Sequence, residues 1–218
     1  STFGLDNVYA YTAAAEEGGY VNGVLAANMT ETDVIGVIGP IEVGDAKLYV
    51  DGFVEGVASV DPEITVNVVY IESFSDVPLA TEAAETQISN GADILTGTAQ
   101  MVVGPIAVAI ENEALWFGTQ SSQDELAEDA GVAYQVYKWE IVLNDIIANV
   151  KEGVLGGESY TLTLENEGLV MEFDADFEVT DEIQAIADDT IESIVVGAVD
   201  PLAEEEMMEP EATEEAGD

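Results

Sequence analysis

The sequence contains no cysteine, no histidine and no arginine, and its only basic side chains are Lys47, Lys138 and Lys151. The absence of cysteine and histidine excludes disulfides, zinc held by these residues, cysteine nucleophiles and Ser-His-Asp triads. Because the phosphates of nucleic acids are bound by Lys and Arg side chains, we expect no nucleic-acid partner. No apolar run reaches the length of a transmembrane helix, so we expect no direct insertion into a membrane.

Acidic residues dominate the charge, because 46 Asp and Glu side chains against three lysines give a formal net charge of -43. Such a charge keeps a protein soluble but destabilises its compact state through self-repulsion. Dissolved salt screens this repulsion, since the Debye length falls to about 3 Å at 1 M. The composition therefore predicts a saline or cation-rich setting, and the alternative is an acidic extracellular protein in an ordinary medium. We expect no cofactor, apart from Ca2+ or other cations that compensate the charge.

Apolar runs alternate with amphipathic segments along the middle of the chain. At 48% hydrophobic residues, the chain can bury a proper core. Apolar runs predict strands at 34–38, 93–95, 115–118 and 132–136, and a run rich in β-branched residues predicts one at 64–71. Amphipathic patterns between them predict helices at 45–59, 78–90 and 103–112. Strands that alternate with helices indicate an α/β fold with a parallel sheet and crossover helices.

The first residues predict a strand at 8–12 and a helix at 16–29. Within this helix, the small residues Gly19, Gly23, Ala26 and Ala27 indicate close packing against another helix. No functional role follows from these small residues alone.

The last third of the chain predicts a helix at 137–152, which the glycines that follow it bring to an end. Two segments of alternating polarity, 160–164 and 169–173, then predict either a β-hairpin or two edge strands. A final helix is expected at 181–193. The Glu-rich segment 201–218 has the composition of a solvated tail.

Several segments in a fixed order resemble the basic membrane protein family, the solute-binding lipoproteins of ABC transporters of the purine nucleoside receptor type. The similarity covers about residues 8–198. No single segment is specific, but the series is. The matching segments are GGYVNG at 18–23, VIGVIG at 34–39, YVDGF at 49–53, YIESFSD at 70–76 and NGADI at 90–94.

The resemblance implies a type I periplasmic-binding fold, in which two α/β lobes close on a nucleoside or a related small molecule. It implies one complete parallel-sheet lobe, formed by residues 34–123, plus an incomplete second lobe. Residues 1–33 and 124–198 would belong to that second lobe, and residues 199–218 would form the acidic tail. The first strands and helices of the second lobe would lie upstream of this sequence.

Candidate ligand-binding residues follow from strand ends and from the resemblance. The loop after strand 93–95 lies at the carboxyl end of a parallel strand, where α/β sheets bind ligands, so Thr98 and Gln100 are candidate donors. In the segment after strand 115–118, Gln120 replaces an acidic residue that the family usually has, and Ser121 follows it. A charged acceptor for a ribose diol would therefore be lost, although Gln120 retains hydrogen-bonding capacity.

The resemblance also places Lys138 where the family keeps a lysine near the ligand. The alternative for Lys138 is an exposed lysine at a helix start. Trp139 beside it would either stack on a base or pack at the hinge between the lobes.

Two functions follow from these observations. The first is an exported, non-enzymatic solute-binding protein, at the cell surface or in the periplasm, that captures a small molecule such as a nucleoside and works with an ABC permease. The second is a self-assembling extracellular structural protein, a filament or surface layer, in which copies of the chain cover each other's incomplete lobe. Paired carboxylates are inevitable at this acid content, so they do not indicate an acid/base enzyme.

Overall fold

The computed structural model of the protein describes residues 2–202, apart from the side chains of Ser122 and Glu128. Its centre is a six-stranded sheet in the order β3-β2-β4-β5-β6-β8. The first five of these strands are parallel, and β8 pairs antiparallel with β6 at the edge. The predicted α/β fold with a parallel sheet is confirmed. The strands are β2 (Val34–Gly39), β3 (Thr65–Tyr70), β4 (Ile94–Gly97), β5 (Leu115–Gly118), β6 (Gly131–Tyr137) and β8 (Leu169–Phe173).

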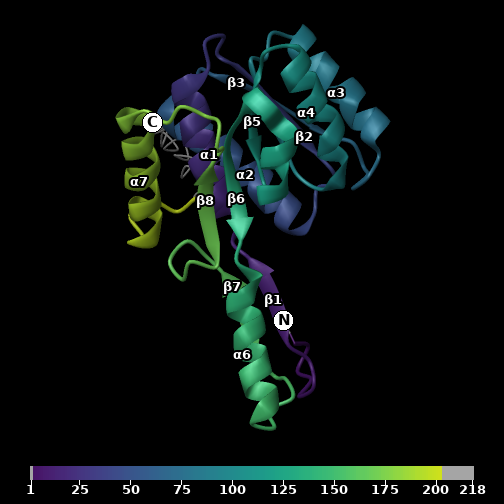
Figure 1. Cartoon of the computed structure of the whole chain (residues 1–218), viewed down its shortest axis with the longest axis vertical. Helices are drawn as coiled ribbons and strands as arrows, with labels where there is room; N and C mark the ends of the chain where they lie inside the picture. Colours follow the sequence, from purple (N-terminus) through teal and green to yellow (C-terminus); the bar gives the residue numbers. More distant parts are fainter. Residues whose placement is uncertain (1, 203–218) are drawn as a thin grey trace, which may run out of the picture.

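Helices cover both faces of the six-stranded sheet (Figure 1). Because side chains alternate along a strand, Ile35 and Val37 of β2 join the core beneath α1, α2 and α7, whereas Ile38 joins the core beneath α3 and α4. None of the described helices is long and apolar enough to span a membrane. The helices are α1 (Ala15–Met29), α2 (Gly44–Val60), α3 (Val77–Ser89), α4 (Val103–Glu111), α5 (Asp124–Ala127), α6 (Trp139–Lys151) and α7 (Asp181–Val195), with 3-10 turns η1 (Gln100–Val102), η2 (Ser121–Gln123) and η3 (Glu128–Ala130).

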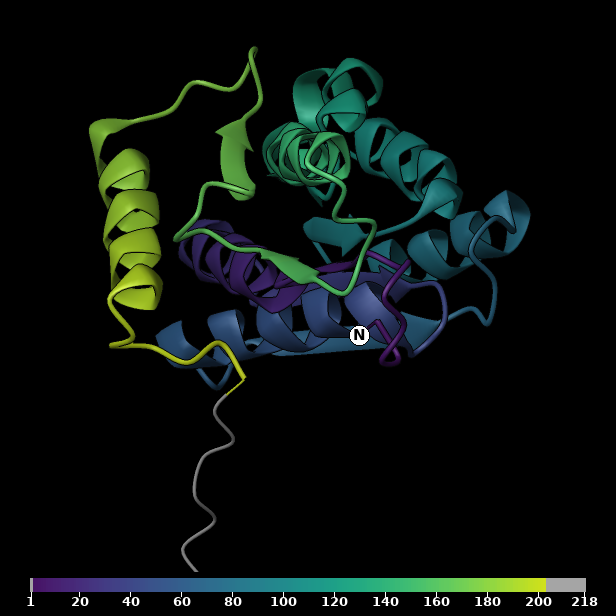
Figure 2. The ribbon, with the colours of Figure 1, turned by 90° about the horizontal axis from the view of Figure 1, so that it is seen from below.

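A smaller unit, which we call the arm, projects from the main sheet and consists of β1 (Ala10–Ala13), β7 (Ser159–Leu162) and α6. Its two strands form a separate parallel sheet, and Figure 1 shows α6 extending away from the main sheet. In the view from below, α6 is seen end-on (Figure 2). The chain passes between the main sheet and the arm after β1, after β6 and before β8.

The β-hairpin that was one of the two alternatives for 160–164 and 169–173 is wrong. β7 pairs with β1 in the arm, and β8 pairs with β6 in the main sheet, so the second alternative, that of edge strands, is correct. Alternation of polarity indicates a half-buried strand but does not specify its partner, because the same pattern fits any sheet edge.

The predicted division into residues 1–33, 34–123 and 124–198 stays a prediction about separable units. In the structure, α1 packs on α2, and β6 and β8 belong to the main sheet. Most of the predicted acidic tail, residues 203–218, lies outside the described residues.

Four glycines bring the backbones of α1 and α2 into direct contact. Gly19 and Gly23 lie on α1, and Gly52 and Gly56 lie on α2. A Cβ atom added to any of the four would overlap a backbone oxygen of the other helix. The close packing that the small residues of α1 predicted is confirmed, and its partner is α2.

We expect Gly23→Ala to destabilise the protein, although alanine is the better helix former by about 1 kcal/mol. The added methyl group overlaps the carbonyl oxygen of Phe53, so the helices must separate, and we expect a net loss of about 2–4 kcal/mol in the free energy of unfolding. Urea denaturation measures this loss. Ala58→Leu adds bulk at an exposed position of α2 and should change stability by less than about 0.5 kcal/mol. Equal stability of the Gly23→Ala and wild-type proteins would contradict the proposed contact.

Candidate functional site

The carboxyl ends of the parallel strands all lie on the side of the main sheet from which the arm projects (Figure 1). We call this side the carboxyl-terminal edge of the sheet. β4 ends at Gly97, β5 at Gly118 and β6 at Tyr137. Parallel α/β sheets bind their ligands at this edge, because the loops after the strands converge there and present backbone and side-chain polar groups. All six predicted site residues follow one of these three strands.

The loops after β4 and β5 touch each other. The Thr119 hydroxyl donates a hydrogen bond to Thr98 Oγ1 at 3.2 Å. Gln100, Gln120 and Ser121 are exposed to solvent, so their polar groups are free to meet a ligand. The structure thus brings four of the six predicted residues to two adjoining loops.

The loop after β4 contains a strained residue, Ala99, between Thr98 and Gln100. Its φ of 72° and ψ of -175° lie in a region of backbone space that is almost reserved for glycine. Such strain costs about 1–3 kcal/mol and persists only where the surrounding structure imposes it, often at ligand sites. Nothing in the pattern of the sequence indicated this conformation, because alanine is normally a helix former.

Lys138 and Trp139 lie where the chain crosses from β6 into the arm. The Lys138 ammonium forms an ion pair with Glu172 of β8, so its positive charge is already compensated. The Trp139 ring stands edge-on to Tyr11, at 5.1 Å between ring centres, and to Tyr137, at 5.4 Å. These two predicted residues therefore pack at the junction with the arm, whereas the other four lie in the loops after β4 and β5.

A buried polar network, which the sequence did not reveal, holds the strand ends from which the two loops begin. The Asn22 side chain on α1 donates hydrogen bonds to the Tyr49 hydroxyl at 3.1 Å and to the Gly118 carbonyl oxygen at 3.2 Å. The Thr96 hydroxyl lies 2.7 Å from the Tyr49 hydroxyl and donates to the Phe117 carbonyl at 2.8 Å. The network therefore joins α1 and α2 to the ends of β4 and β5.

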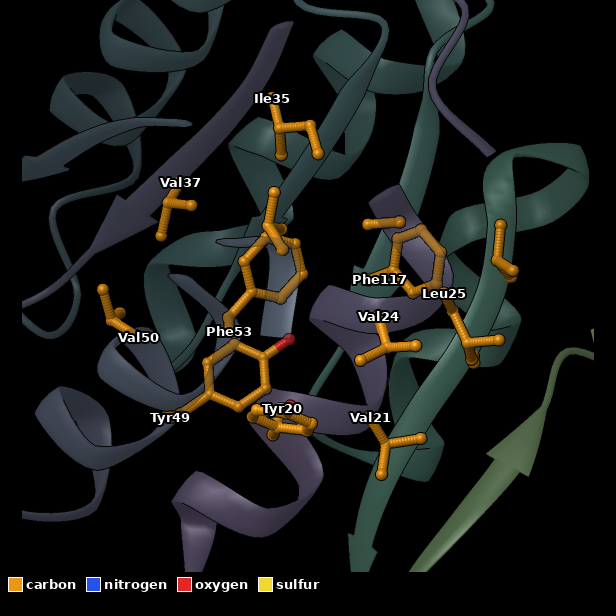
Figure 3. Packing of buried hydrophobic residues seen from close by; sticks show 14 of the residues in the cluster. Tyr20, Val21, Val24, Leu25, Ile35, Val37, Tyr49, Val50, Phe53 and Phe117 are labelled. Atoms are coloured by element: carbon orange, nitrogen blue, oxygen red, sulfur yellow. The ribbon is translucent and has the colours of Figure 1, made fainter. Parts of the chain in front are cut away.

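Tyr49 is fully buried and lies beside Phe53 in the core between the helices and the sheet (Figure 3). Burial raises the pKa of its hydroxyl to about 12, despite the hydrogen bonds with Thr96 and Asn22. A polar residue in the apolar stretch of α1, Asn22, was the one available sign of this network.

Carboxylates give this edge of the sheet a negative character. Glu16 and Asp45 lie in the first turns of α1 and α2, and the Thr12 hydroxyl donates to Asp45 at 3.4 Å. Burial, supported by the nearby Asp45, raises the pKa of the half-buried Glu16. The pKa of Tyr137 is also raised, first by burial and then by Asp45. With Lys138 paired, an anionic ligand would meet net repulsion here.

A metal centre is not evident in the described part of the chain, where no group of three or more Asp or Glu side chains is arranged to hold an ion. The polar groups that the loops of the candidate site present are hydroxyls, amides and carboxylates.

This architecture, a mostly parallel sheet with helices on both faces, is that of a type I periplasmic-binding-protein-like fold. A solute-binding protein of Conexibacter woesei shares it with a TM-score of 0.74 at 20% identity, over 90% of this chain and 66% of that one. At this identity the likeness shows the fold alone.

Sequence comparison then gives the family. The family described as ABC transporter substrate-binding protein PnrA-like matches residues 2–199, and the chain belongs to it. The chain is 30% identical to a purine-binding protein of Brucella abortus over 198 residues, which is 90% of this chain and 55% of that protein. It is 28% identical to the ABC transporter nucleoside-binding protein BmpA of Lactococcus lactis over 206 residues, 85% of this chain and 59% of BmpA. The chain thus spans little more than half the length of these relatives.

Tyr49→Phe tests the buried network. Removing the hydroxyl should lower the free energy of unfolding by about 1–3 kcal/mol near neutral pH, because Asn22 and Thr96 lose a partner.

The same variant should also change the response to alkali. Since the pKa of Tyr49 is about 12 in the folded state and 10.0 as a free side chain, its neutral form stabilises the fold fully below pH 10 and loses this contribution as the pH rises through 12. The stability of Tyr49→Phe should therefore fall less than that of the wild type between about pH 10 and 12. Denaturation at several pH values measures this, with Tyr20→Phe as the control. Parallel pH profiles for Tyr49→Phe and the wild type would contradict the assignment.

Ala99→Gly should stabilise the protein, in contrast to most Ala→Gly substitutions. Release of the strained φ outweighs the added chain entropy of glycine, which leaves a net gain of about 1 kcal/mol. Ala107→Gly, at an exposed position of α4, should instead cost about 1 kcal/mol. Thermal unfolding of both variants provides the comparison, and equal losses would show that Ala99 is not strained.

Proposed function

We propose that the chain is the ligand-binding part of an exported, non-enzymatic solute-binding protein that captures a nucleoside-like small molecule for an ABC permease. The observation that supports this most strongly is family membership over residues 2–199, together with convergent polar loops at the ligand-binding edge of the sheet. The two relatives named for purine and nucleoside binding favour the same class of ligand.

Thr98, Gln100, Gln120 and Ser121 would hydrogen-bond the polar groups of the ligand from the loops after β4 and β5. Lys138 would orient it from the junction with the arm, where its pair with Glu172 holds the ammonium in place. Trp139 would offer a ring edge or face at the same junction, braced by Tyr11 and Tyr137.

Closure would take place where the chain crosses into the arm. The crossing segments lie side by side there and are joined by backbone hydrogen bonds. The Ala14 amide donates to the Leu162 carbonyl at 2.9 Å, and the Lys138 amide donates to the Gly168 carbonyl at 2.8 Å. A few residues of this kind absorb the rotation in hinge closure. The ligand would shift the equilibrium toward the closed state by binding it more tightly.

The charge of the site favours a neutral or cationic ligand over a phosphorylated one. Glu16 and Asp45 stand at this edge, the ammonium of Lys138 is paired, and Gln120 supplies an uncharged amide. A nucleoside satisfies these conditions, whereas a nucleotide would bring its phosphate toward carboxylates.

Self-assembly into an extracellular filament or surface layer is the second candidate function. The observation in its favour is the exposed apolar surface of the arm, and the net charge of -43 opposes association of identical chains unless salt screens it.

Calorimetric titration with adenosine and inosine, each compared with its monophosphate, tests the proposed binding function. We expect saturable binding of a nucleoside and at least about tenfold weaker binding of the monophosphate, equivalent to about 1.4 kcal/mol. Gln120→Leu should weaken nucleoside binding about 3–10-fold through the loss of one hydrogen bond.

Gln184→Leu is the matched control, because the side chain of this exposed glutamine of α7 hydrogen-bonds only Asp188 in the described structure. It should leave the affinity unchanged. Absence of nucleoside binding, or equal binding of the monophosphate, would contradict the proposed function.

A further inference from the structure

The main sheet ends laterally at β3, and the outer side of this strand is unpaired. Within residues 2–202, β3 pairs only with β2, in parallel. The amides of Thr65 and Ile71 donate hydrogen bonds to the segment of β2, at 2.8 and 3.0 Å. Because the backbone groups of successive residues point to opposite sides of a strand, the N–H and C=O groups of Val66, Val68 and Tyr70 point away from β2. These groups are able to bond a further strand.

The β3 strand lacks the features that usually protect a sheet edge. Edge strands in natural proteins carry charged side chains, proline or a bulge, which discourage pairing with another chain. The run ITVNVVYI at 64–71 contains no charged residue and no proline. Its register with β2 is regular, one residue to one, from Thr65 to Tyr70. In a chain with 46 acidic residues, this uncharged strand is a candidate surface for strand pairing.

Apolar side chains lie exposed on both faces of the sheet beside this edge. Val68 is 40% exposed and lies on the face of β3 that also carries Val66 and Tyr70. On the opposite face, a groove between β3 and α3 is lined in part by Val69 and Leu79, and Leu79 is 42% exposed. A strand added to β3 would place alternate side chains beside Val68 and in this groove.

Carboxylates surround the uncharged strand. Asp61 and Glu63 precede it, Glu72 follows it, and Glu82 of α3 lines the groove. The complementary segment therefore has apolar side chains at its centre and basic side chains at its ends.

A second copy of this chain fits the edge less well. If two β3 strands paired antiparallel about Asn67 and Val68, Glu63 of each copy would lie opposite Glu72 of the other. Like charges directly opposite each other destabilise strand pairing. The net charge of -43 on each copy adds to this repulsion.

We propose that the β3 edge binds an extended segment of another protein as an additional strand, a segment with alternating apolar residues at its centre and Lys or Arg at its ends. Hydrogen bonds to the outward backbone groups of β3 supply the affinity in this form of recognition, and the groove and the carboxylates supply the selectivity.

The probe for the test is the capped synthetic peptide KVTVTVK, titrated into the full chain at 0.15 M salt and followed by amide hydrogen exchange. It should bind saturably and protect the amides of Val66, Val68 and Tyr70. The opposite lateral edge of the same sheet, β8, serves as an internal control and should keep its exchange rates.

Two further peptides separate strand pairing from simple attraction of charge. KVTPTVK has the same charge, but its proline removes the central N–H group and disfavours the strand, so it should bind at least tenfold more weakly. EVTVTVE keeps the strand pattern and reverses the charge of the ends, and it should also bind at least tenfold more weakly.

Val68→Lys should weaken binding of KVTVTVK at least tenfold, because it places a positive charge beside the bound segment. It should keep the circular dichroism spectrum of the wild type, since the side chain is exposed. Val196→Lys is the matched control, because this valine after α7 is 67% exposed and lies outside the β3 edge. It should bind the peptide as the wild type does.

Failure of KVTVTVK to bind would overturn the proposal, as would equal binding of the three peptides or protection of β8 instead of β3. A homodimer that Val68→Lys abolishes would also overturn it, because the edge would then belong to a second copy. None of these outcomes depends on nucleoside binding, so failure here is distinguishable from failure of the proposed function.

Discussion

The structure depends on the contact between the backbones of α1 and α2. Four glycines allow these helices to approach until each meets the carbonyl oxygens of the other, which no larger residue permits. At this separation Asn22 on α1 reaches both the Tyr49 hydroxyl on α2 and the Gly118 carbonyl at the end of β5. Close packing of the two helices thus fixes the position of the strand ends through Asn22. The loops of the candidate site begin at these strand ends.

In the proposed closure, the main sheet is the rigid part of the molecule and the arm is the part that moves. The main sheet is covered on both faces, and hydrogen bonds of Asn22, Tyr49 and Thr96 hold the ends of β4 and β5 in place. The side-chain oxygen of Asn22 is buried without a hydrogen-bond partner in the described structure. The arm is joined through three crossing segments, with Lys138 and Trp139 at one of them. A ligand that contacts both parts would therefore be enclosed when the arm moves toward the main sheet. In a two-lobed binding protein, ligand binding is linked to a change of conformation in this way.

Much of this fold was predictable because the relevant signals are local. The pattern of apolar residues was enough to predict the strand at 34–39 and the amphipathic helices. Gly19 and Gly23 were enough to predict a close contact between helices. The partners of 160–164 and 169–173 were not predictable, since alternation defines a strand and not its neighbour. The strain at Ala99, the pairing of Lys138 with Glu172 and the Asn22–Tyr49–Thr96 network depend on residues far apart in the sequence, so only the three-dimensional structure reveals them.

The central claim is that the strand-end loops and the junction with the arm form one small-molecule site. The most direct measurement is a two-dimensional amide NMR titration with adenosine, which also detects weak binding. The account predicts shifts confined to the amides around Thr98, Gln120 and Lys138. Shifts confined instead to the open groove between β3 and α3, around Tyr70 and Ala83, would contradict it, as would a spectrum that adenosine leaves unchanged.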